Sequence, residues 1–412
     1  MDTSSLIALA IPVFFLLILC EYLFGLFTGN NTYRLNDTFA SVSLGMISRF
    51  PPMLNLGFQG AIFAYAASHL NLTLMPTESW VTWTIAFVLY DLTYYWMHRL
   101  HHEIKVLWAT HVVHHQGEEF NLSTALRQTS SGFLWKWIFF VPMFVLGVPA
   151  EVFVTVGALN LLYQFWVHTE HVPKLGIFET VFVTPSNHRV HHAQNKEYID
   201  ANYGGVFILW DRIFGTFIEE KTDLSPVYGT VKPLHSWNPV WANIEIFHQM
   251  IRDTIYAKSA KDKVRVWFSD TSWRPADAEK RFPKKINNLD DFKKYNPVAS
   301  KNIKVYGFVQ FFILNVIALV TFFTLDRQGY GETVLLGTIL VVSLTSVSMV
   351  FENVQGSSLI ELVRAGLLLV IFFTGLIDSS LLVSQILVVH ALMNIILISI
   401  LFPVRKIFLL VK

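Results

Sequence analysis

Long apolar runs recur along the chain and predict helices that cross a membrane. A spanning helix needs about 20 mostly apolar residues. Two further stretches, residues 39–70 and 362–376, are apolar but are interrupted by Arg, Pro or charge. The pattern predicts an all-α, polytopic membrane helix bundle with a histidine-rich cap. The runs of spanning length are residues 5–27, 80–97, 305–324, 333–350 and 382–402.

Four regions follow from this pattern. Residues 1–97 are predicted to be N-terminal transmembrane helices, and residues 98–217 form a separate region that carries most of the histidines. Within the second region, the apolar arms 133–146 and 152–167 are joined by a turn at Gly147-Val148-Pro149. Each arm is short for a straight span, so segment 133–167 is predicted to enter the membrane and return. Residues 218–304 form a polar, basic segment, and residues 305–412 form C-terminal transmembrane helices.

The charge distribution predicts which face carries the histidines. If the hairpin returns, no span separates His192 from the basic segment 218–304, which holds about half of the Lys and Arg. A surplus of these residues marks the cytoplasmic side of a membrane. We therefore expect a catalytic face towards the cytosol, at the endoplasmic reticulum in a eukaryote or the inner membrane in a bacterium.

Charge and cysteine content narrow the function further. The net charge of +1 gives no electrostatic case for binding nucleic acid. A single cysteine, Cys20, argues against a disulfide framework and a cysteine metal site. Asp2, with no Lys or Arg before the first apolar run, favours a retained anchor over a cleaved signal peptide.

Histidines are concentrated in one part of the chain. Eleven of the fifteen lie between residues 98 and 192, in H-x3-H and H-x2-H-H patterns that direct several imidazoles to one place on a helix. For His101 and His171, ligand and structural roles stay equally open. His69, His235, His248 and His390 are better interpreted as structural. The eight core histidines exceed the needs of one ion and suit two: His98, His102, His111, His114, His115, His188, His191 and His192.

The spacing does not identify the metal. Neutral imidazole binds iron, zinc and copper. A structural zinc site closes with four ligands, and a catalytic one usually takes three. Eight or more histidines beside apolar helices favour two redox ions that act on oxygen.

The histidine motifs resemble those of the fatty acid hydroxylase and sterol desaturase superfamily, and within it most resemble the alkylglycerol monooxygenases. The resemblance is dense over residues 85–220. The matching stretches are 91–103 (DLTYYWMHRLHHE), 121–128 (NLSTALRQ), 161–170 (LLYQFWVHTE), 184–192 (TPSNHRVHH) and 202–217 (NYGGVFILWDRIFGTF).

The resemblance implies roles for individual residues. The eight core histidines would bind two irons, and His168 would be a further ligand. Glu103 matches a glutamate that the family needs for activity, and it could orient a ligand imidazole as a hydrogen-bond acceptor. His171 and Asn187 depart from the usual pattern. The resemblance also implies tetrahydrobiopterin or another external reductant, although no stretch reads independently as a pterin site.

The function predicted on this basis is the hydroxylation of a membrane lipid. The favoured reaction attacks the carbon beside the ether oxygen of an alkylglycerol and gives a fatty aldehyde and a glycerol lipid. An alternative is a hydroxylase or desaturase of sterols, fatty acyl chains or other polar lipids. A different class, the metal transporter, should place its ligands along several spanning helices near the midplane of the membrane.

Two sets of polar residues outside the histidine motifs complete the sequence-based predictions. Asp91, Asp200, Asn202 and Asp211 are candidates either for supporting the ligands or for capping helices. Charges in the C-terminal helices are functional suspects by default, but most of them are expected at helix ends and none in the active site. They are Asp326, Arg327, Glu352, Glu361, Arg364 and Asp378.

Overall fold

The computed structural model describes residues 3–54, 58–378 and 380–402. Within these ranges all regular elements are helices, apart from two isolated bridges, Phe182–Phe207 and Ala193–Tyr228. The predicted all-α class is therefore confirmed. The chain forms two compact units. Unit 1 comprises Met1–Tyr33, Asn55–Leu234 and Asn243–Lys293, and unit 2 comprises Arg34–Leu54, His235–Ala242 and Lys294–Lys412.

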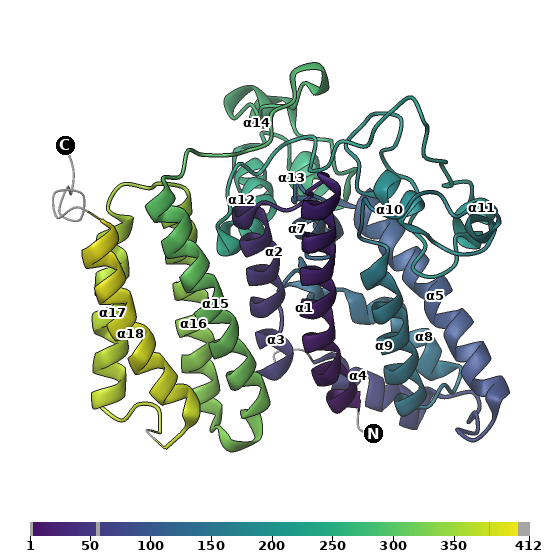
Figure 1. The fold of residues 1–412 in the computed structure, drawn as a ribbon. Helices are drawn as coiled ribbons and strands as arrows, with labels where there is room; N and C mark the ends of the chain where they lie inside the picture. Colours follow the sequence, from purple (N-terminus) through teal and green to yellow (C-terminus); the bar gives the residue numbers. More distant parts are fainter. Residues whose placement is uncertain (1–2, 55–57, 379, 403–412) are drawn as a thin grey trace. The chain divides into compact units, whose positions relative to one another are not determined.

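Unit 1 combines long helices with short ones that carry the histidines (Figure 1). Helices α8 and α9 both pack against α5, and α1 packs against α9. The helices are α1 (Thr3–Thr28), α4 (Gln59–Tyr65), η1 (Ala66–Leu70), α5 (Trp80–Glu103), α6 (Lys105–Trp108), α7 (Val112–His115), η2 (Thr124–Leu126), η3 (Gly132–Leu134), α8 (Lys136–Val145), α9 (Ala150–Trp166), η4 (Gly176–Thr180), α10 (Pro185–His191), α11 (Leu209–Phe214), most of α12 (Pro239–Tyr256), α13 (Ala260–Phe268), α14 (Ala276–Arg281) and η5 (Leu289–Asp291).

Unit 2 is a bundle built around four long helices that run side by side in Figure 1. Close packing depends on glycine: a Cβ on Gly307 would lie 2.1 Å from the ring of Phe351, and one on Gly337 would lie 2.7 Å from Phe50. Aromatic rings therefore rest directly on helix backbones. The helices are α2 (Leu35–Ile47), α3 (Phe50–Met53), α15 (Lys301–Phe323), η6 (Leu325–Arg327), α16 (Tyr330–Phe351), α17 (Ser357–Phe373) and α18 (Leu382–Leu401).

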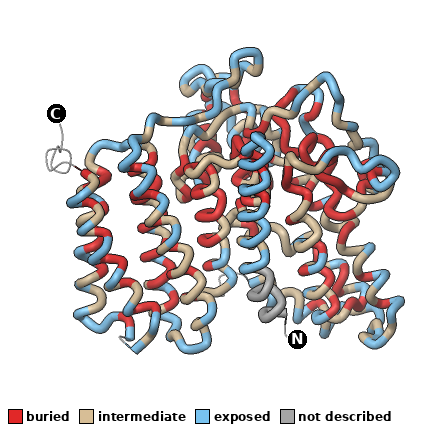
Figure 2. Tube along the Cα trace, viewed as in Figure 1, coloured by how far each residue is buried: buried red, intermediate tan, exposed pale blue. Residues whose placement is uncertain are grey.

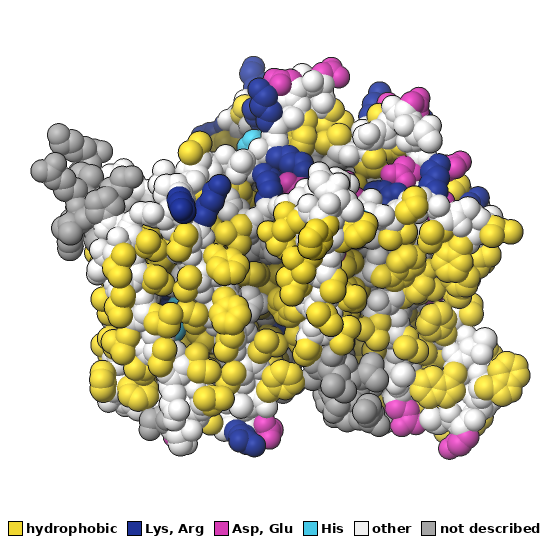
Figure 3. Space-filling view, in the orientation of Figure 1, with side chains coloured by type: hydrophobic (Ala, Val, Ile, Leu, Met, Phe, Trp, Pro, Cys, Tyr) yellow, Lys and Arg dark blue, Asp and Glu magenta, His cyan; other side chains and the backbone are white. Residues whose placement is uncertain are grey.

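Four of the five predicted spanning runs fall on helices long and apolar enough to cross a membrane. These helices are α1, α15, α16 and α18. Their outward faces are exposed, as the blue stretches of Figure 2 show, and hydrophobic side chains cover the middle of the helices in Figure 3. The fifth run, 80–97, lies within α5, which is helical but not among the four. The chain is an integral membrane protein.

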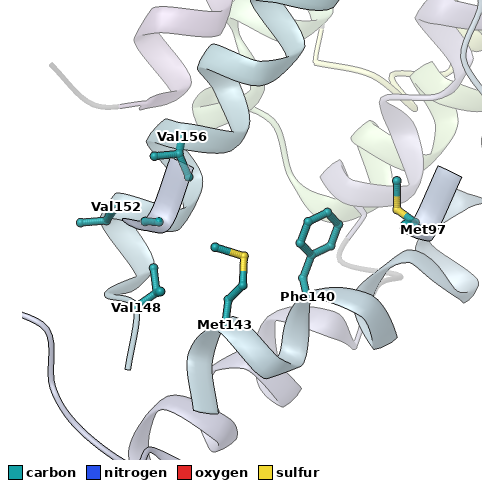
Figure 4. Close-up of a cluster of buried hydrophobic side chains, with 7 residues drawn as sticks. Met97, Phe140, Met143, Val148, Val152 and Val156 are labelled. Carbon is teal, nitrogen blue, oxygen red and sulfur yellow. The ribbon is translucent and has the colours of Figure 1, made fainter. Parts of the chain in front are cut away.

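Helices α8 and α9 form a hairpin closed by a turn that only glycine fits. Gly147 has φ of +89°, and a Cβ there would lie 2.0 Å from the carbonyl oxygen of Thr73. Side chains of Phe140 and Met143 on α8 and of Val152 on α9 are buried in one cluster (Figure 4). The expected pair of helices is therefore present, while its entry into the membrane stays a prediction.

Unit 2 contains a buried network of polar side chains. Glu361 and Arg364 lie inside α17, are 0% and 4% exposed, and form a salt bridge of 2.5 Å. These two are therefore the exceptions to the expectation that most of these charges lie at helix ends, whereas Glu352 is the C-cap residue of α16 and Asp326 lies in the short η6. The buried side chains that surround the pair come from three other helices: Tyr306 and Gln310, Ser343, and His390 and Asn394.

Candidate metal centre

Four segments bring the predicted ligands together: the end of α5, helix α7 with the residue before it, the turn after α9, and helix α10. Helix α10 begins with a reciprocal cap in which the Thr184 backbone N–H donates to the Asn187 side chain at 3.0 Å, and Pro185 occupies the first turn. Asn187, one of the two departures from the family pattern, thus fixes the start of the helix that carries the last three predicted ligands.

All nine predicted ligands fall into two groups. Within each group the candidate ligand atoms lie within 4.8 Å of one another. Neighbouring histidines separate: His114 and His115 belong to different groups, as do His191 and His192. The five-histidine group is His98, His102, His111, His115 and His191, and the four-histidine group is His114, His168, His188 and His192.

Backbone carbonyls set the protonation of the four-histidine group. The Nδ1 atom of His114 lies 3.0 Å from the carbonyl oxygen of Arg127, and that of His168 lies 2.8 Å from the carbonyl oxygen of Gln164. A carbonyl can only accept, so both Nδ1 atoms carry the hydrogen and both Nε2 atoms of the neutral rings present lone pairs. These Nε2 atoms are 3.3 Å apart. Two facing acceptors at that distance repel unless a cation lies between them.

The five-histidine group has the same construction. His98 Nδ1 donates to the carbonyl of Tyr203 and His191 Nδ1 to that of Ala201, both at 2.9 Å. Both Nε2 atoms are therefore acceptors. The Nε2 of His191 is buried with no hydrogen-bond partner among the described residues. Unpaired buried acceptors are costly, and a bound cation would satisfy them.

Burial keeps the histidines in the form that binds metal. It lowers the pKa of His191 to about 4 and that of His168 to about 3. Burial, followed by the neighbouring histidines, also lowers the pKa of His115 and His192 well below the ordinary value. The rings are neutral at pH 7, and neutral imidazole is the ligand species. Two all-nitrogen donor sets of this kind fit two transition-metal ions, iron among them.

Two buried carboxylates hold the loop that orients His98. Asp211 accepts the backbone N–H groups of Tyr203 at 2.7 Å and Gly204 at 2.8 Å, and burial raises its pKa to about 6. Asp91 accepts those of Val206 and Phe207 at 2.8 and 2.9 Å. Both residues therefore support the ligands indirectly, by holding the backbone of this loop. Ligand support is one of the two roles predicted for them.

Tyr203 is a site residue that the sequence did not reveal. Its ring is fully buried, with centroid distances of 5.9 Å to His98, 5.3 Å to His102 and 5.9 Å to His191. It closes one side of the five-histidine group and excludes water there. The only sequence signal was its place in the matching stretch 202–217.

Glu103 lies outside both groups. Its carboxylate accepts from Arg99 Nε at 2.8 Å, and its side chain is 42% exposed. The structure thus brings together the nine histidines but not the predicted acid. A role for Glu103 in activity stays a prediction.

The two histidines with open assignments also lie outside the groups. His101 is buried, and its Nδ1 lies 2.6 Å from the carbonyl oxygen of Met97. His171 makes an edge contact with Phe24, at 5.1 Å between ring centroids. The geometry favours the structural reading of both.

Comparison with known proteins places this arrangement in a family. Residues 83–216, which contain all nine histidines, match the fatty acid hydroxylase family model. The alkylglycerol monooxygenase of Xenopus tropicalis is 34% identical over 89% of this chain and 82% of its own length, and that of Homo sapiens is 33% identical over the same shares. An ornithine lipid hydroxylase of Rhizobium tropici is 30% identical over 33% of this chain and 43% of its own. No solved structure matches.

The chain belongs to the fatty acid hydroxylase family, a class of membrane oxidoreductases. Within that family, the relatives that align along most of its length are alkylglycerol monooxygenases. The sequence-based recognition is confirmed, and the enzyme class with it.

Proposed function

We propose that this protein is a di-iron monooxygenase that hydroxylates the alkyl chain of a membrane lipid at the carbon next to an ether oxygen. The observation that carries the proposal is the pair of buried imidazole groups whose lone pairs face one another, 3.3 Å apart between His114 and His168. A cation between the two nitrogens would turn this repulsion into attraction. Membership of a hydroxylase family favours iron and oxygen chemistry over zinc.

The protein itself would position the ions, keep the imidazoles neutral and exclude water from the site. Two bound irons would activate dioxygen, and the histidines would hold them. The first iron would be held by His98, His102, His111, His115 and His191, and the second by His114, His168, His188 and His192. Aromatic rings cover the groups: Phe120 lies 5.6 Å from the ring of His168, and Trp108 lies 5.0 Å from that of His102. Excluding water in this way protects a reactive oxidant.

The overall reaction balances with one external reductant. One oxygen atom of dioxygen enters the C–H bond of the lipid, and the other leaves as water with two electrons and two protons from the reductant. Hydroxylation beside an ether oxygen gives a hemiacetal, which collapses to a fatty aldehyde and a free glycerol hydroxyl. The alkylglycerol monooxygenase relatives support an alkylglycerol as substrate. We propose tetrahydrobiopterin as reductant, with another pterin or a redox protein as alternatives.

A membrane assay tests the reaction. Membranes that contain the protein are given a 1-O-alkylglycerol with and without tetrahydrobiopterin, and fatty aldehyde is measured. We expect aldehyde only when lipid, oxygen and reductant are all present. No aldehyde under either condition, with iron bound, would overturn the ether substrate and leave the hydroxylase class standing.

A second substrate class has support from one relative. The ornithine lipid hydroxylase match favours hydroxylation of a polar lipid that has no ether bond to cleave. Lipid profiling would then detect a stable hydroxylated lipid and no aldehyde. The transporter class is not favoured, because none of the nine grouped histidines lies on the four helices apolar enough to span a membrane.

We also propose that the histidine-bearing face lies in the cytosol. The support is the basic composition of segment 218–304 and the absence of a predicted span between His192 and residue 305. Protease added outside sealed microsomes, or outside inverted bacterial vesicles, should cut within residues 258–300. Protection of that segment on the cytosolic side would contradict the proposed orientation.

A further inference from the structure

Helix α1 has an exposed apolar surface of the kind that faces lipid, and it carries one buried acidic residue. Its neighbours Leu17, Leu23 and Phe24 are 42%, 40% and 52% exposed, as expected for a helix surrounded by lipid. Glu21 is only 8% exposed. A carboxylate within a spanning helix is costly and normally has a function.

Three donors from unit 1 converge on the Glu21 carboxylate. The hydroxyl of Thr169 donates to one oxygen at 2.5 Å, and the backbone N–H of Leu122 donates to the other at 2.8 Å. The hydroxyl of Tyr33 donates to that second oxygen as well. Every partner is a donor and both oxygens are used, so an amide, with a single accepting oxygen, could not replace the carboxylate.

Two of these donors lie next to ligands of the four-histidine group. Thr169 directly follows His168. Leu122 begins the loop that ends at Arg127, whose carbonyl accepts from His114 Nδ1 at 3.0 Å and whose Nε donates to the carbonyl of Val113 at 2.6 Å. One carboxylate on α1 therefore joins the two segments that position His114 and His168.

Two contacts away from the carboxylate hold α1 in register. The rings of Phe14 and Phe165 stack at 4.1 Å between centroids. A Cβ on Gly25 would lie 2.9 Å from the carbonyl oxygen of Asn30, so the chain returns close against the helix. Removing the carboxylate should therefore leave α1 attached to unit 1.

We propose that Glu21 is a positioning residue for the second iron, acting through Thr169 on His168 and through the Leu122–Arg127 loop on His114. This inference rests on the proposed di-iron function. The five-histidine group is linked to Glu21 less directly, because Arg127 reaches it only through the backbone carbonyl of Val113, on the helix that also carries His115. The two ions should therefore respond differently to a change at this position.

The test compares iron binding in full-length Glu21→Gln, Thr169→Val and wild-type protein, purified in detergent and titrated with ferrous iron. Iron per chain and the iron Mössbauer spectrum are measured, not only turnover. Wild type should bind two irons. Glu21→Gln should bind the first iron normally and the second about 10 to 100 times more weakly, the usual range for loss of a group that orients a ligand. Thr169→Val, which leaves Glu21 and its other two bonds in place, should weaken the second iron less.

Glu151→Gln is the matched control, because this exposed carboxylate lies in the first turn of α9, at the other end of that helix from His168. It should bind both irons as wild type does. Equal weakening of both irons in Glu21→Gln and Thr169→Val, or wild-type binding of both, would overturn the inference while leaving the di-iron proposal intact. Wild type that binds fewer than two irons would instead overturn the proposed function, and the inference with it.

Discussion

The two units bury polar side chains among apolar helices in opposite ways. In unit 1, nine histidines present the same kind of atom to one another, and acceptors face acceptors at 3.3 Å between His114 and His168. In unit 2, unlike groups meet: Arg364 donates to both oxygens of Glu361, while Gln310 accepts from Arg364 and bonds the ring of His390. The first cluster needs something from outside the chain, whereas the second is nearly complete by itself.

This difference separates a binding site from a structural network more clearly than burial does. Both clusters are buried, and both contain histidine. Only the pairing of donors with acceptors distinguishes them. The network of unit 2 therefore joins α15, α16, α17 and α18, whereas the clusters of unit 1 have the pattern expected of the proposed ion sites.

The largest effect should come from removing one ligand of either group. His114→Ala and His191→Ala each delete a ligand and its oriented lone pair, so we expect iron content to fall and product formation to drop at least about 100-fold. Iron analysis and the aldehyde assay measure this. The exposed His69→Ala is the control and should match wild type. Full iron and turnover in either ligand variant would show that the grouped histidines do not hold the metal.

A smaller but still large effect is expected in unit 2 on stability alone. Arg364→Leu leaves the Glu361 carboxylate buried without its cation, which costs about 3–5 kcal/mol in the free energy of unfolding. The double variant Glu361→Leu/Arg364→Leu should recover most of that loss. Thermal unfolding in detergent measures both, and iron per folded chain should stay at the wild-type value. Loss of iron without loss of stability would make the network part of the site.

Removing the metal should destabilise unit 1 by a comparable or smaller amount. A ligand that binds only the folded state at 100 times its Kd stabilises by about 2.7 kcal/mol. Treatment with a ferrous chelator should therefore lower the Tm, and added iron should restore it. The Arg364→Leu variant should show the same shift on chelation as wild type, since its defect lies in the other cluster. If chelation left the Tm unchanged, the histidine groups would not be stabilised by bound metal in the folded protein.

The smallest effect tests the support of one ligand. Asp211→Asn keeps the size of the side chain but offers only one oxygen to the N–H groups of Tyr203 and Gly204. The carbonyl that orients His98 then loses its fixed position, and the iron of the five-histidine group should bind about 10 to 100 times more weakly. Ferrous titration measures the change. If only the iron of the four-histidine group bound more weakly, Asp211 would not act on His98 through Tyr203.

Helical spacing explains why the ligand set could be predicted and its partition could not. Residues four apart share a helix face, so the pairs His98 and His102, His111 and His115, and His188 and His192 each fall in one group. Adjacent residues point about 100° apart, which sends His114 away from His115. The group to which each histidine belongs depends on how α5, α7, α9 and α10 pack together. No local sequence pattern determines that packing.

The supporting groups were hidden for a different reason. The carbonyls of Arg127, Gln164, Ala201 and Tyr203 fix four imidazoles, yet every residue has a carbonyl and none stands out in a sequence. Glu21 did leave a signal, as the only acid inside the first apolar run. The membrane helices were largely predictable because length and apolarity decide them, whereas Glu361 and Arg364 lie inside α17 because their partners come from other helices.

The separation of the ligands along the chain has a consequence for how the protein is made. Each group needs a residue of α10: His191 completes one, and His188 and His192 complete the other. If these histidines hold the ions as proposed, a ribosome must synthesise the chain past residue 192 before either ion can be fully held. None of the nine grouped histidines lies in residues 305–412, so metal loading could then begin while the C-terminal helices are still being translated. The supply of iron to nascent chains would then set how much active enzyme a cell obtains.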